Sequence, residues 1–112
     1  MTKIWKGTWL HKLAATPAAI RDDVKRLAAA GFDMLVPCIY QTSGITDYAS
    51  KIGNIRPEFR SWDPLMVCAE EANRLGLAIH AWVCVFPEGE ESALLKAHPE
   101  YVAVAGPERD AG

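Results

Sequence analysis

The chain repeats one pattern that restricts its fold more than any other feature: an apolar segment rich in β-forming residues, a helical segment, a glycine, and another apolar segment. The apolar segments cover residues 4–10, 34–40 and 77–85. The second is apolar on both faces, which is typical of strands buried in parallel sheets. Strands separated by helices of about a dozen residues form right-handed parallel crossovers. The repeat therefore predicts a βαβαβ arrangement of the α/β class.

Each predicted helix carries its own start and stop signals. Thr16 and Asp63 are residue types that cap helix N-termini, and a proline follows each at the first helical position, where its missing N–H costs nothing. Gly31 and Gly76 come after the last helical residues, and glycine adopts the left-handed geometry that ends helices. We therefore expect one helix between Thr16 and Gly31 and another between Asp63 and Gly76.

The remaining segments carry weaker signals. We expect a long loop over residues 41–62, a short helix over 91–97 and a brief extended piece over 101–104. Pro37 lies within the second predicted strand, and proline cannot donate to a strand ladder. We therefore expect an irregularity or bulge there.

Composition and charge exclude several classes of function. Apolar residues make up 50% of the 112 residues, enough for one domain, which we assign to residues 1–105, with 106–112 as a disordered tail. The net charge is −2 and no basic stripe is present, so nucleic acid is not an expected partner. No apolar run approaches the roughly 20 residues that span a bilayer, so no membrane partner is expected. The chain as written lacks a signal peptide, and we therefore expect it in the cytoplasm. Relatives that carry such a peptide would be exported.

The sequence carries no signature of a cofactor or a metal ion. The turn after the first predicted strand, residues 11–16, lacks the G-x-G-x-x-G pattern of dinucleotide-binding folds. The histidines show no H-x-H or H-E-x-x-H spacing. Cys38, Cys68 and Cys84 lie far apart in apolar runs, so we expect buried, inert thiols. We expect no cofactor and no metal site.

The two faces of the predicted strands differ in chemistry. Because successive side chains point to opposite faces, Ile79 and Ala81 belong to an aliphatic face, whereas His80 and Trp82 belong to the other. On the neighbouring second strand, we expect the Tyr40 side chain to lie on the same face of the sheet as His80 and Trp82. Aliphatic faces suit packing against helices, and a polar-aromatic face near strand C-termini suits a barrel interior that opens into a site. We favour a partial (β/α)8 TIM-type barrel, roughly its first three β/α units, over a doubly wound sheet.

Four side chains are candidates for substrate binding. Tyr40 and Trp82 offer aromatic rings that can stack on sugars. His80 shares the face of Trp82, and His11 directly follows the first predicted strand. We predict that His80, Trp82 and Tyr40 cluster near the C-terminal strand ends, with His11 as a further lining residue.

Five segments in order resemble the family 10-like glycosyl hydrolases. These segments are GTWLH (7–11), AAGFD (29–33), WDPL (62–65), EEANRLGLAIHAW (70–82) and LLKAHPEY (94–101). The resemblance covers nearly the whole chain, from about residue 6 to residue 104. It implies a (β/α)8 catalytic domain that acts on glycosidic bonds, in some members those of cell-wall polysaccharide. The family often has Asn shortly after the HAW motif, where this chain has Val83, Cys84 and Val85.

No catalytic residue can be assigned in this chain. Glycoside hydrolysis generally needs two carboxyl groups, about 5–5.5 Å apart for retention and about 6.5–9.5 Å apart for inversion. Glu90 and Glu91 begin the short predicted helix, and Asp47 and Glu58 are expected to be solvated in the long loop. Glu88 is the one acid near a strand tip. The resemblance implies that the catalytic carboxylate lies on a later strand, beyond residue 112.

The sequence thus predicts the N-terminal fragment of a carbohydrate-active hydrolase, which is catalytically incomplete alone and has a poly- or oligosaccharide as its partner. One alternative is a sugar isomerase or epimerase barrel, whose divalent metal would be held by later strands. Another is a non-catalytic carbohydrate-binding or interaction protein. Open strand edges also predict self-association.

Overall fold

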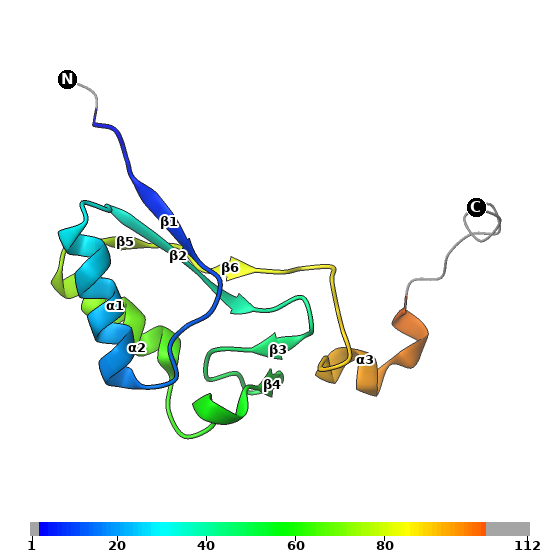
Figure 1. Cartoon of the computed structure of the whole chain (residues 1–112). Coiled ribbons are helices and arrows are strands. Elements are labelled where there is room, and N and C mark those ends of the chain that lie inside the picture. Colours follow the sequence, from blue (N-terminus) through cyan, green and yellow to red (C-terminus); the bar gives the residue numbers. More distant parts are fainter. Residues whose placement is uncertain (1–2, 103–112) are drawn as a thin grey trace.

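The computed structural model describes residues 3–102, which form a mixed α/β structure with a small mixed sheet (Figure 1). The longest strand, β2 (Met34–Tyr40), lies at the centre of the parallel part. It pairs with β1 (Gly7–Leu10) on one side and with β5 (Ala78–Ile79) and β6 (Trp82–Val83) on the other. All of these pairings are parallel. Strands that are successive units of the sequence repeat are therefore neighbours in the sheet.

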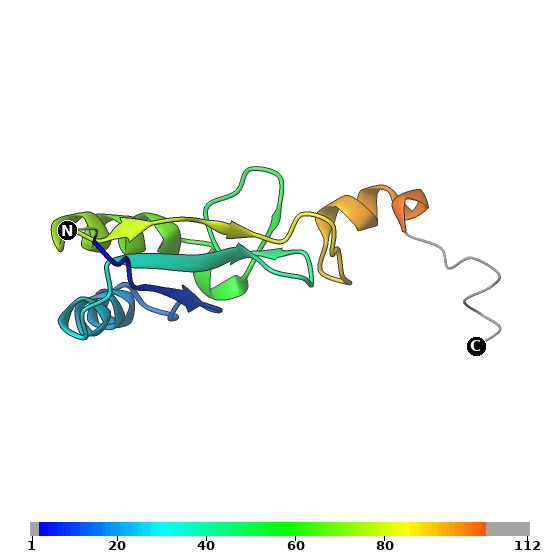
Figure 2. The ribbon, with the colours of Figure 1, turned by 90° about the horizontal axis from the view of Figure 1, so that it is seen from above.

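Two helices cover one face of these strands. Helix α1 (Pro17–Ala29) begins where the Thr16 side chain accepts the backbone N–H of the third helical residue. Helix α2 (Pro64–Arg74) begins where Asp63 accepts two backbone N–H groups in the same way. Both helix starts are confirmed. The helices pack against each other, and Figure 1 shows both on the same side of the parallel strands. Figure 2, which looks down onto the strands, shows the two helices side by side.

Glycines end both helices as the sequence predicts. Gly31 and Gly76 have φ values of 92° and 75°, in the left-handed region that other residues rarely adopt. After α1, the backbone N–H of Phe32 donates to the carbonyl of Leu27 at 3.1 Å, which is the long hydrogen bond of a Schellman cap. The chain is thereby turned from helix back into strand.

The core lies between the helices and the sheet. Leu35 of β2 is completely buried in it, and Leu10 and Ile79 from the neighbouring strands pack against its edge. Its fully buried members are Leu13, Ile20, Val24, Leu35, Phe59, Cys68, Ala72 and Leu77. The apolar stripes of the helices and one face of the strands therefore meet as alternation predicts.

The predicted long loop over residues 41–62 contains more structure than expected. It holds two short strands, β3 (Ile45–Thr46) and β4 (Asn54–Ile55), and the 3₁₀ helix η1 (Pro57–Phe59). Strand β3 pairs antiparallel with the end of β2 and parallel with β4. The parallel pairing predicted for the three apolar segments is confirmed. The sheet is mixed because the segment after β2 folds back along it and adds an antiparallel pairing.

The predicted third strand, residues 77–85, is shorter and split. Only the β5 and β6 residues pair with β2, and His80 and Ala81 separate them. Against β6 the register shifts between Cys38 and Tyr40, so β2 is irregular there. The irregularity predicted at Pro37 thus lies immediately after it. The first strand begins at residue 7 rather than residue 4.

The last described segment also differs from its prediction. Helix α3 (Ala93–Ala97) begins two residues later than expected, because the Ser92 side chain accepts the backbone N–H of Leu95 and caps it. The extended piece predicted from residue 101 is wrong at its first residue, since Tyr101 ends the 3₁₀ helix η2 (Pro99–Tyr101). Residues 103–104 and the predicted tail, 106–112, lie outside the described residues. Among residues 3–102, no helix is long and apolar enough to cross a membrane.

Candidate functional site

Three rings form a cluster where β1 ends and β6 begins. The Trp82 ring meets the Trp9 ring at a centroid distance of 5.1 Å and an interplanar angle of 69°. It meets the His11 imidazole at 5.2 Å and 75°. Both are edge-to-face contacts, the geometry that aromatic quadrupoles prefer. We call Trp9, His11 and Trp82 the aromatic cluster.

The strand register places this cluster on the face of the sheet away from the helices. Leu10 and Leu35 pack into the core, so their alternating neighbours must point the other way. Trp9 is one of these neighbours, and 60% of its surface is exposed. Trp82 pairs in register with Cys38 on β2. Because β1 and β6 flank β2 and run parallel to it, the C-terminal part of β1 and the start of β6 bring Trp9 and Trp82 together.

The four predicted binding residues do not all meet. His11 and Trp82 are in contact, and Trp9, which the sequence reasoning missed, joins them. Its signal was available, since Trp9 stands two residues before His11 on a segment with strand alternation. His80 is exposed, and within the described part of the chain its ring is in neither an aromatic pair nor a hydrogen bond; its backbone N–H donates to the carbonyl of Leu35 at 2.9 Å.

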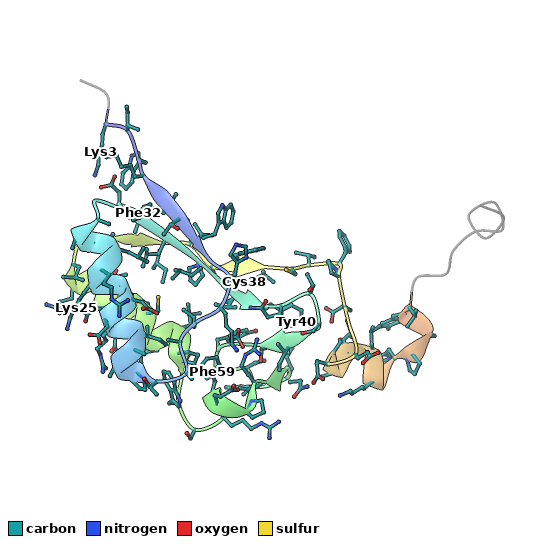
Figure 3. All side chains as sticks on the ribbon, in the orientation of Figure 1. Lys3, Lys25, Phe32, Cys38, Tyr40 and Phe59 are labelled. Carbon is teal, nitrogen blue, oxygen red and sulfur yellow. The ribbon has the colours of Figure 1, made fainter. Side chains whose placement is uncertain are left out.

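Tyr40 belongs to a separate polar contact at the end of β2 (Figure 3). Its hydroxyl donates to the Glu88 carboxylate, whose oxygens lie 2.9 and 2.8 Å away. Burial raises the pKa of the Tyr40 phenol above its ordinary value, and the hydrogen bond to Glu88 raises it further. The phenol is therefore protonated at neutral pH and holds Glu88 in a fixed position.

A buried polar network lies behind the cluster. Asp47, expected to be solvated, is completely buried, and Arg56 donates to it from Nε at 2.7 Å and from Nη2 at 3.2 Å. Gln41 Nε2 lies within hydrogen-bond distance of Asp47 Oδ2 (3.2 Å) and of the carbonyls of His11 (3.0 Å) and Cys38 (3.2 Å). The expectation that Asp47 is solvated was wrong, because Arg56, which directly follows β4, pairs with its carboxylate. The network ties the backbone at His11 to the end of β2.

The exposed acid of the same loop behaves as the sequence predicts. Glu58 is exposed. In residues 3–102 no group of three or more His, Cys, Asp or Glu side chains could hold a metal ion.

The thiols are free, and two of them lie on neighbouring segments. Cys38 and Cys68 are buried, and Cys84 is partly buried. Burial raises the pKa of Cys38 to about 11, with the adjacent Cys84 thiol adding to the shift. Burial alone raises the pKa of Cys68 to about 11. Thiols with such values are almost entirely protonated at neutral pH, which makes Cys38 and Cys68 poor nucleophiles.

Comparison with protein-family models, with curated proteins and with solved structures found no match for this chain.

Proposed function

We propose that this chain forms the first β/α units of a glycoside-hydrolase-like (β/α)8 barrel and that its aromatic cluster binds carbohydrate. The observation that carries the proposal is the position of Trp9, His11 and Trp82. Trp9 and His11 lie at the C-terminal end of β1, and Trp82 lies beside the C-terminal half of β2, on the face away from the helices. In a β/α barrel that face is the interior, and sites form at that end of the strands.

The chemistry of the cluster suits a sugar. A pyranose ring has an apolar C–H face, which packs on an indole, and hydroxyl groups around its edge, which need hydrogen-bond partners. Trp9 supplies an exposed indole and His11 supplies an exposed imidazole with a donor and an acceptor nitrogen. Within residues 3–102 most of the Trp9 surface is accessible, so the indole is free to contact a ligand.

The proposed role of this chain is binding rather than bond cleavage. The carboxylate nearest to a strand tip, Glu88, already accepts the hydroxyl of Tyr40, and no second carboxylate is assigned to act with it. Following the resemblance, we place the catalytic carboxylates on strands beyond residue 112. The isolated chain should therefore bind oligosaccharides without hydrolysing them.

The test is a titration of the purified chain with oligosaccharides of cellulose, xylan and chitin, followed by tryptophan fluorescence and calorimetry. For the best ligand, Trp82→Ala and Trp9→Ala should each weaken binding by about 1–3 kcal/mol, the range for losing an aromatic contact with its burial. Trp5→Ala is the matched control. Trp5 is 58% exposed and lies outside the cluster, beneath the Lys3 ammonium.

Two outcomes would contradict the proposal. One is that no oligosaccharide of the panel binds saturably. The other is that Trp5→Ala weakens binding as much as Trp82→Ala, which would mean that any exposed indole suffices.

A further inference from the structure

A cleft lies apart from the aromatic cluster, where the segment after β6 meets α3 and η2. Its volume is about 430 Å³, within the range of roughly 300–1,000 Å³ typical of small-molecule sites. The residues that line it are Val85, Phe86, Glu88, Leu94, Leu95, Tyr101 and Val102. None of them belongs to the aromatic cluster.

The lining is apolar and accessible. Phe86 is 93% exposed and Val85 is 70% exposed, although both lie within three residues of the end of β6. Tyr101 and Leu94 are also exposed from the opposite wall. Large apolar side chains that gather at one accessible place on a protein mark sites where something binds.

One charged group faces this apolar lining. Glu88 is the single carboxylate of the cleft, and in residues 3–102 it forms no ion pair. Tyr40 holds it through one hydroxyl proton, whereas an ionised carboxylate has about four acceptor positions. Glu88 is partly buried, and a charge that is partly removed from water is stabilised by an oppositely charged partner that hydrogen-bonds to it. The cleft therefore favours a cation over a neutral ligand.

We propose that this cleft binds an organic ammonium ion with an apolar or aromatic body. The ammonium group donates to the Glu88 carboxylate, and the body packs on Phe86 and Tyr101. Aromatic rings favour cations beside their faces, which adds to the same selectivity. A neutral sugar suits the cleft poorly, because most of its hydroxyl groups would face side chains that offer no hydrogen bond.

The experiment uses the full chain labelled with ¹⁵N and titrated with 2-phenylethylammonium, with 2-phenylethanol as the neutral probe of similar shape. The ammonium ion should shift backbone resonances of residues 85–102, and Glu88→Gln should weaken its binding about tenfold or more, as expected for a hydrogen bond to a charged group. Glu90→Gln is the matched control, since Glu90 is exposed and does not line the cleft. Its affinity should stay within about twofold of the parent.

Phe86→Ala provides a second variant, because a side chain this exposed can be truncated without loss of folding. It should weaken the binding of both probes, and that of the ammonium ion at least as much as that of the alcohol. Equal affinity for the two probes, unchanged affinity in Glu88→Gln, or shifts gathered at Trp9 and Trp82 would each overturn the proposal. The site lies outside the aromatic cluster, so either proposal can fail while the other stands.

Discussion

Replacing Arg56 by methionine should be the most damaging single change outside the apolar core. Asp47 is completely buried, and the Arg56 side chain is only 19% exposed. The substitution removes two of the three side-chain hydrogen bonds that reach this carboxylate, leaving the one from Gln41. Breaking a buried ion pair costs about 3–5 kcal/mol. Because water can reach part of Arg56, we expect Arg56→Met to lower the free energy of unfolding by about 2–4 kcal/mol.

A loss of this size is easy to measure. Urea unfolding of a small domain has an m-value of about 1–3 kcal/mol/M, and with a central value of about 2 kcal/mol/M the midpoint should fall by about 1–2 M. Unfolding should be followed by tryptophan fluorescence and circular dichroism together, which also tests whether the transition is two-state. The matched control is Arg60→Met. Arg60 is exposed, and within residues 3–102 its side chain reaches only the carbonyl of Ile55, at 3.3 Å. Arg60→Met should therefore lower the free energy of unfolding by less than about 1 kcal/mol.

A double-mutant cycle separates the ion pair from the packing of the arginine stem. The variant Asp47→Asn with Arg56→Met no longer buries a charge, so it should be more stable than Arg56→Met alone. If Arg56→Met and Arg60→Met cost the same, or if the double variant is the less stable one, then Asp47 is not held as a buried charge and the reasoning fails.

Three further predictions concern titration and reactivity. The hydrogen bond from Arg74 lowers the pKa of Glu71. The contribution of Glu71 to stability is therefore present above its ordinary pKa and is lost as the pH falls through its lower pKa in the folded state. In acid unfolding, Glu71→Gln should make the free energy of unfolding fall less steeply with decreasing pH. Burial raises the pKa of Tyr40, so its contribution to stability is present below the ordinary value of 10.0 and is lost at more alkaline pH. Tyr40→Phe should reduce the loss of stability between about pH 9 and 11, leaving the part due to the buried thiols, and thermal melts over this range would show the difference. With iodoacetamide at neutral pH, Cys84 should be alkylated before Cys38, whose pKa is about 11, and peptide mass mapping of a time course checks the order.

The parts of the fold that the sequence predicts well depend on local chemistry. A helix start needs a side-chain acceptor three residues before a backbone N–H, and Thr16 supplies one to Ala19. A helix end needs a residue that tolerates positive φ, which Gly31 and Gly76 provide. Each of these features depends on residues within a few positions of one another, so the sequence alone indicates it.

The polar contacts around the site depend on distant segments and were therefore missed or misjudged. Tyr40 and Glu88 are 48 positions apart, and the Tyr40 ring alone gives no sign of a carboxylate partner. Asp47 and Arg56 are nine positions apart, but they meet only because β3 and β4 pair side by side. Two-residue strands are too short for alternation to reveal them. Sequence reasoning consequently described the loop as solvated.

The candidate site depends on the register of β1, which must be correct to within one residue. Leu10 packs against the core beneath the sheet, and Trp9, its immediate neighbour, is left 60% exposed on the other side. A slip of one position along β1 would bury the indole against α1 and expose the leucine. The same apolar helix stripe that fixes this register therefore directs Trp9 toward Trp82. Because the aromatic face follows from packing on the opposite face, the barrel proposal and the carbohydrate proposal rest on one and the same structural fact.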